Sequence, residues 1–169
     1  MGDERSAGDE KEWIPWSPEE AYKRLAQRGL TAEDTKFWSS LELRSDFAKQ
    51  YLKDERGGAW IARPYQLASL ESQEKRKVHC DGRDVGKTSE IELIAAWASV
   101  AQPNRQMLIA TQCENHLFPL MHRITRRISE TPALAGNLVE SRRSPSWYLR
   151  FRNGFQLWGR LSGPRGVNF

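Results

Sequence analysis

The stretch Cys80-Asp-Gly-Arg-Asp-Val-Gly-Lys-Thr88 decides the predicted fold. A short strand is predicted before it, at Lys77 to Cys80, and a helix is predicted after it, from about Gly86 to Ala101. Backbone N–H groups at a helix N-terminus lack partners within the helix and carry partial positive charge, so they bind phosphate oxygens well. Lys87 adds a full charge for β- and γ-phosphates, and the Thr88 hydroxyl is a suitable Mg²⁺ ligand. The stretch therefore predicts a phosphate-binding loop.

This loop departs from the pattern G-x-x-x-x-G-K-[ST] at its first position. That position is Asp81, and a glycine follows only at Gly82. The alternative interpretation is a surface Gly-Lys-Thr tripeptide that arose by chance. The predicted strand before the loop and the predicted helix after it favour the phosphate-binding interpretation, in which Gly86 lets the backbone approach a phosphate without a Cβ in the way.

The segments that follow alternate between strand and helix patterns. The apolar run Gln106–Thr111 predicts a buried strand, residues 114–130 predict a helix, and the dipeptide Asn153-Gly154 predicts a hairpin turn between Trp147–Phe151 and Phe155–Trp158. This alternation predicts an α/β fold with a mainly parallel sheet and helices on both faces. It is typical of a P-loop NTPase core, here expected to lack the C-terminal strands.

The N-terminal third has a different character. Residues 1–12 are polar and predict a disordered tail, and residues 13–58 predict a small helical lobe that ends at Gly57-Gly58. Within this lobe, Ser17-Pro18-Glu19-Glu20 and Thr31-Ala32-Glu33-Asp34 are helix N-terminal signals. Residues 59–169 are then the front part of the phosphate-binding domain.

Charge is distributed unevenly along the chain. Residues 1–60 hold 13 acidic and 10 basic residues, a net charge of −3, whereas residues 61–169 hold 9 acidic and 16 basic residues, a net of +7. A basic second half suits a polyanionic ligand, either a nucleotide or a nucleic acid. We expect no membrane association, because no apolar run approaches the roughly 18 residues that a span needs. The two cysteines, Cys80 and Cys113, are expected to be buried thiols, and no zinc site is expected.

Four segments, in the same order, resemble the large terminase subunit of tailed phages, a DNA-packaging motor ATPase. The segment Gly82-Arg-Asp-Val-Gly-Lys-Thr88 is similar to its altered P-loop. Arg63-Pro-Tyr-Gln66 resembles its adenine-recognition motif, about 20 residues before Lys87. Leu108-Ile-Ala-Thr111 falls where its second motor strand lies, and Asn153-Gly154 with Gly159–Phe169 resembles its hairpin and the segment just before the Walker B strand.

The resemblance implies ATP and Mg²⁺ as cofactors. Gln66 would recognise the adenine edge and Tyr65 would pack beside the base. The phosphates would lie on Gly82, Arg83, Asp84, Val85, Gly86, Lys87 and Thr88. Arg83 and Lys87 would be the catalytic residues, and Thr88 would hold Mg²⁺. For Tyr65 and Gln66 the alternative is an ordinary helix start, and for Arg83 it is a solvated surface arginine.

The same resemblance implies partners and a missing half. Double-stranded DNA, a portal and a small terminase subunit would be the partners of a homo-oligomeric ring in the host cytoplasm. P-loop hydrolases also need a strand that ends in one or two carboxylates, to hold Mg²⁺ and to activate water. This chain contains no apolar strand that ends in Asp-Glu, and we therefore expect it to be inactive as an ATPase in isolation.

Two other functions fit the same motifs. A helicase-like ATPase also places a glutamine motif before its P-loop, and a non-catalytic protein with a relict P-loop could bind DNA or a portal. Arg123, Arg126 and Arg127 are either phosphate contacts or a solvated helix face, and the second interpretation is favoured for them, as it is for Arg142 and Arg143. The tryptophans are expected to pack in the core or between domains rather than to stack on bases.

Overall fold

The computed structural model describes residues 31–54, 56–72, 74, 76–78, 82–83, 85–144 and 146–162. The predicted tail 1–12, the helix predicted from Ser17 and the loop residues His79–Asp81 and Asp84 lie outside the described residues, as does the segment 163–169. None of the described helices is long and apolar enough to cross a membrane.

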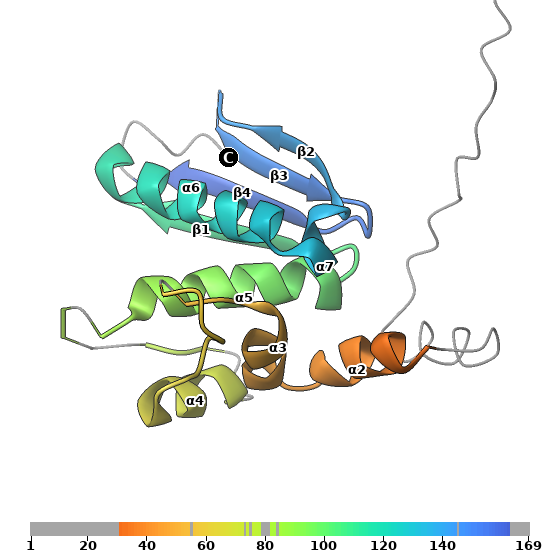
Figure 1. The fold of residues 1–169 in the computed structure, drawn as a ribbon. Helices are drawn as coiled ribbons and strands as arrows, with labels where there is room; N and C mark the ends of the chain where they lie inside the picture. The colour runs from red at the N-terminus through yellow and green to blue at the C-terminus, as the bar shows by residue number, and fades with distance from the viewer. Residues whose placement is uncertain are drawn as a thin grey trace, which may run out of the picture.

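Along the described chain, four helices come first, and one strand, two helices and three consecutive strands follow (Figure 1). The helices are α2 (Ala32–Ser40), α3 (Arg44–Tyr51), α4 (Pro64–Glu71), α5 (Lys87–Ala101), α6 (Glu114–Glu130) and α7 (Pro132–Ala135), and the strands are β1 (Gln106–Thr111), β2 (Leu138–Arg142), β3 (Trp147–Phe151) and β4 (Gln156–Leu161). The helix start predicted at Thr31 is confirmed: its side chain accepts a hydrogen bond from Asp34 N, and the Asp34 carboxylate accepts one from the Thr31 backbone. The helices predicted at 86–101 and 114–130 and the strand at 106–111 are confirmed as α5, α6 and β1.

The sheet is mixed, so the expectation of a mainly parallel sheet was wrong. The strand order is β1-β4-β3-β2. Only β1 and β4 pair in parallel, whereas β4 with β3 and β3 with β2 are antiparallel. The turn at Gly154, which has a φ of +74°, connects β3 to β4 directly. A connection this short allows only antiparallel pairing, because a parallel pair needs a crossover.

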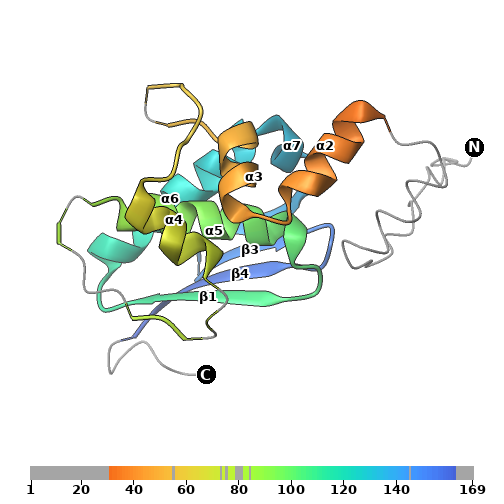
Figure 2. The same cartoon turned by 90° about the horizontal axis from the view of Figure 1, so that it is seen from below.

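The described helices lie on one side of the sheet, so helices on both faces were also a wrong expectation for this part of the chain. Figure 2 shows the strands as one layer with all labelled helices above it. The approach of α6 to β4 is close, since a Cβ built at Gly159 would lie 3.0 Å from Met121 Cγ on α6. A glycine at this point lets the helix and the sheet pack directly.

The predicted strand at Lys77–Cys80 is not present in its described part. Lys77 and Val78 lie outside the helices and strands, and Val78 is 91% exposed. A single apolar residue offers little burial to a strand, and a strand also needs a partner that supplies hydrogen bonds. Cys113, expected to be buried, is exposed just before α6.

One hydrophobic core joins the helices to the sheet. It contains Phe47 and Leu52 from the α3 region, Leu93 from α5, Ile124 from α6 and Leu149 from β3. The indole N–H of Trp97 on α5 donates to the Leu41 carbonyl at 3.0 Å. The helices at residues 32–51 therefore pack on the same core as α5.

Candidate nucleotide-binding site

The beginning of α5 has the backbone geometry that a phosphate-binding turn needs. Gly86 is the N-cap residue and has a φ of +87°, a left-handed conformation that glycine adopts without steric penalty. Its carbonyl accepts the first helical hydrogen bond, from Glu90 N at 3.1 Å. The N–H groups of the first turn, which includes Lys87 and Thr88, point out of the helix end, where an anion is stabilised.

Lys87 folds back across the loop. Its ammonium group donates a hydrogen bond to the carbonyl of Gly82, five residues earlier. Gly82, Arg83 and Thr88 are exposed, while Lys87 is half-buried. The structure thus brings Gly82 and the lysine amine together near the N-terminus of α5. A lysine amine, a threonine hydroxyl and a helix N-terminus suit a nucleotide phosphate and its Mg²⁺.

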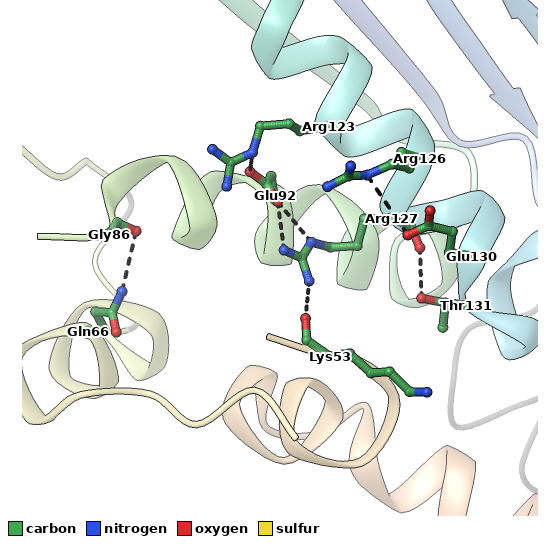
Figure 3. Close-up of polar contacts among 9 residues, drawn as sticks. All are labelled: Lys53, Gln66, Gly86, Glu92, Arg123, Arg126, Arg127, Glu130 and Thr131. Atoms are coloured by element: carbon green, nitrogen blue, oxygen red, sulfur yellow. Dashed lines mark hydrogen bonds and ion pairs between the residues drawn. The ribbon is translucent and has the colours of Figure 1, made fainter. Parts of the chain in front are cut away.

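Gln66 connects α4 to this loop. Its side chain is buried (5% exposed), and its Oε1 accepts a hydrogen bond from the backbone N–H of Arg63 at 3.0 Å. Its Nε2 donates to the carbonyl of Gly86 at 3.3 Å (Figure 3). One amide therefore both caps the start of α4 and contacts the loop 20 residues further along the chain.

Tyr65 makes the neighbouring contact. Its hydroxyl donates to the carbonyl of Val85 and accepts from the Arg63 guanidinium at 3.1 Å. The ring is 46% exposed beside the loop. The tetrapeptide Arg63–Gln66 is thus a helix start, as the alternative interpretation predicted. It also makes hydrogen bonds to the carbonyl groups of Val85 and Gly86.

A second contact joins α4 to α5 one turn further along, and Lys77 contacts the C-terminal end of α4. The Ser69 hydroxyl donates to the Glu90 carboxylate, which is 9% exposed. The Lys77 ammonium donates to the carbonyl of Ser69 at 2.6 Å and to that of Ser72 at 3.0 Å. The sequence analysis did not single out Glu90, although a carboxylate in the first turn of the helix after the predicted phosphate-binding loop was a visible signal.

The arginines of α6 have a structural role that neither sequence interpretation predicted. Glu92 on α5 is 1% exposed, and it forms ion pairs with Arg123 at 2.6 Å and with Arg127 at 2.8 Å (Figure 3). Arg127 also donates to the carbonyl of Lys53 at 2.8 Å, beyond the end of α3. Only Arg126 fits the solvated-face interpretation, since its side chain is 62% exposed and lies 3.9 Å from Glu130.

A cleft of about 1110 Å³ lies beside this ion-pair cluster. Its walls come from α2, α3, α5, α6 and α7, and they include Phe37, Tyr51, Lys53 and Arg126. Burial raises the pKa of the Tyr51 phenol, the negative charge of Glu33 acts in the same direction, and a hydrogen bond with Ser40 opposes both. The lining contains none of the described loop residues (82, 83 and 85–88), so the cleft is separate from this part of the candidate phosphate site.

The aromatic and arginine predictions for the sheet have mixed outcomes. Trp60 and Trp147 are buried, in agreement with core packing, whereas Trp158 is half-buried on the sheet. Arg142 pairs with Glu140 at 3.0 Å and stacks on Tyr148, and Arg143 stacks on Trp147. Within the described residues no group of three or more histidine, cysteine, aspartate or glutamate side chains is arranged to hold a metal ion.

In comparisons with known proteins, no family model and no curated protein matches this chain.

Proposed function

We propose that this chain is the ATP-binding part of a P-loop ATPase of the terminase large-subunit kind, a motor that translocates double-stranded viral DNA into a procapsid. One observation carries the proposal: the Arg63–Gln66 motif contacts Val85 and Gly86 at the beginning of the helix that bears Lys87 and Thr88. A chance Gly-Lys-Thr tripeptide on a surface has no reason to be held by a glutamine motif 20 residues away.

The proposed roles follow from these positions. ATP phosphates lie on the N–H groups of the first turn of α5, and the Lys87 ammonium exchanges the Gly82 carbonyl for the β- and γ-phosphates. The Thr88 hydroxyl holds Mg²⁺, and the exposed guanidinium of Arg83 neutralises charge on the γ-phosphate. Double-stranded DNA, a portal and a small terminase subunit are the proposed partners, and a homo-oligomeric ring in the host cytoplasm is the proposed setting.

Titration of fluorescent ATP against the purified chain tests this proposal. The substitution Lys87→Ala is expected to weaken binding by at least tenfold, because it removes the charge that faces the phosphates. The matched control is Lys49→Ala, which removes the same charge from an exposed position on α3. Equal ATP affinities of Lys87→Ala and the wild-type chain would contradict the assignment of residues 82–88 as a phosphate-binding loop.

Base selectivity is a separate prediction that concerns Gln66. Its side-chain amide offers a donor and an acceptor, which match the adenine edge. Gln66→Ala is expected to narrow the difference in affinity between ATP and GTP, measured by competition with the same fluorescent nucleotide. If the ATP-to-GTP ratio is unchanged while both affinities fall together, Gln66 supports the loop through Gly86 and does not recognise the base.

A further inference from the structure

The face of the sheet that points away from the helices carries aromatic rings and arginines in register. Side chains alternate between the two faces of a strand. Leu108, Trp158, Tyr148 and Arg142 form one row across all four strands, and Gln106, Gln156, Arg150 and Glu140 form the next row. Arg160 pairs with Ala110 beyond the first row. We call these residues the open face of the sheet.

The rings of Tyr148 and Trp158 on the open face contact one another at an angle of 46°, and guanidinium groups lie over them. Tyr148 is buried under its neighbours (6% exposed), so the half-buried Trp158 is the accessible ring. The ring centroids of Tyr148 and Trp158 are 4.3 Å apart. The guanidinium of Arg142 lies 4.8 Å from the Tyr148 centroid, and that of Arg160 lies 5.1 Å from the Trp158 centroid. Leu108, at the end of this row, is 52% exposed. No described helix covers this side of the sheet (Figure 2).

The charge on the open face is positive. It holds three arginines, and Glu140 is its one carboxylate among the described residues; Glu140 pairs with Arg142 and Arg150 at 3.0 and 3.1 Å. Arg160 has no carboxylate partner among these ion pairs, and its contact is with the face of Trp158. A second copy of the chain is a poor occupant, because two such faces would bring like charges together. A covering layer of polypeptide would bury three guanidinium groups with only one carboxylate to pair with them, which costs desolvation free energy.

We propose that the open face binds single-stranded nucleic acid. Unpaired bases stack on Trp158 and on the guanidinium planes beside it, and backbone phosphates contact Arg142, Arg150 and Arg160. A half-buried indole between arginines suits a single strand because the bases of a single strand are accessible, whereas a duplex presents mainly phosphates to such a surface. This inference does not depend on the proposed nucleotide site, which lies at the beginning of α5.

The test is fluorescence anisotropy with the complete chain and a fluorescein-labelled 12-nucleotide dT strand at two salt concentrations. Saturable binding is expected that weakens as salt is raised, because phosphate contacts release counterions. Trp158→Ala and Arg160→Ala are each expected to weaken binding roughly tenfold. The matched control is Arg126→Ala, which removes an exposed arginine from α6 and should leave the affinity within about twofold.

Two further measurements keep the proposal falsifiable. Far-UV circular dichroism melts identify any variant that does not fold. Arg150→Gln then takes the place of that variant, because the Arg150 side chain is 46% exposed and its substitution disturbs packing little. Lys87→Ala should leave dT binding unchanged, which separates this surface from the nucleotide site. The inference is overturned if no saturable binding occurs, if an unlabelled duplex competes as well as the single strand, or if Arg126→Ala or Lys87→Ala matches the loss caused by Arg160→Ala.

Discussion

Gly86 combines two constraints that no other residue type satisfies. Its φ of +87° lies in the left-handed region, and a Cβ built on it would lie 2.7 Å from the Gln66 amide nitrogen. A side chain at Gly86 is therefore strained by its own backbone and also displaces the amide that holds α4 against the loop. Because this amide is buried, Gln66 has little room to move away.

The substitution Gly86→Ala is expected to lower the free energy of unfolding by about 1–2 kcal/mol for the left-handed backbone alone, with a further loss from the contact with Gln66. In a Gln66→Ala background the contact is absent, so Gly86→Ala should cost less there, and urea denaturation of the four proteins measures the difference. Gly136→Ala is the control, because its φ is −67° and a Cβ there meets nothing within 4 Å. Equal losses in both backgrounds would show that the Gln66 contact contributes nothing.

At the scale of elements, Glu92 connects α5 to α6. A carboxylate that is 1% exposed is stable there only because Arg123 and Arg127 neutralise it, and Arg127 extends the connection to the chain that follows α3. Removing one partner from a buried ion pair typically costs about 3–5 kcal/mol, because the remaining charge stays buried.

Glu92→Gln is therefore expected to lower the free energy of unfolding by several kcal/mol, up to about 3–5 kcal/mol. The control Glu42→Gln removes the same charge from an exposed side chain and should stay within about 0.5 kcal/mol of the wild-type chain. Chemical denaturation followed by tryptophan fluorescence measures both. A Glu92→Gln variant as stable as Glu42→Gln would show that solvent, and not the two arginines, stabilises this carboxylate.

Elements with strong local signals were predictable from the sequence, and elements that depend on distant partners were not. The capping pair Thr31 and Asp34, the amphipathic helix α6 and the turn at Gly154 are local, and the structure confirms each of them. Strand β2 was missed because its residues Leu138–Arg142 have a weak alternation and gain their order from pairing with β3. The strand direction was wrong because alternating helices and strands do not by themselves distinguish a hairpin from a crossover.

The candidate site shows the same difference between local signals and contacts between distant segments. The residues of the predicted phosphate loop are adjacent in the sequence, and so their grouping was predictable. The contacts of Gln66 with Gly86 and of Glu92 with Arg127 join segments 20 and 35 residues apart. Helical periodicity placed Glu92 on α5 but could not show that the same turn faces α6, because that depends on how the two helices pack.

At the scale of the whole molecule, the candidate site has groups suited to phosphates but no described group to activate water. Phosphoryl transfer to water depends on placing Mg²⁺, the γ-phosphate and an attacking water together, and carboxylates at a strand end supply the last of these. The 169 residues contain no apolar strand that ends in Asp-Glu. Glu90 is engaged by Ser69, Glu114 lies exposed at the beginning of α6, and Asp84 lies outside the described residues.

We therefore predict that the chain binds ATP but releases phosphate at near background rates in the presence of Mg²⁺. The measurement is phosphate release by the purified wild-type chain and by Lys87→Ala, with ATP binding followed in parallel by titration. The expected result is weak ATP binding by the wild-type chain, weaker still for Lys87→Ala, and equally slow phosphate release by both proteins, because no carboxylate activates the attacking water. Turnover that survives repurification and disappears in Lys87→Ala would contradict this. In that case Glu90→Gln, Glu114→Gln and Asp84→Asn would identify the carboxylate that activates the water.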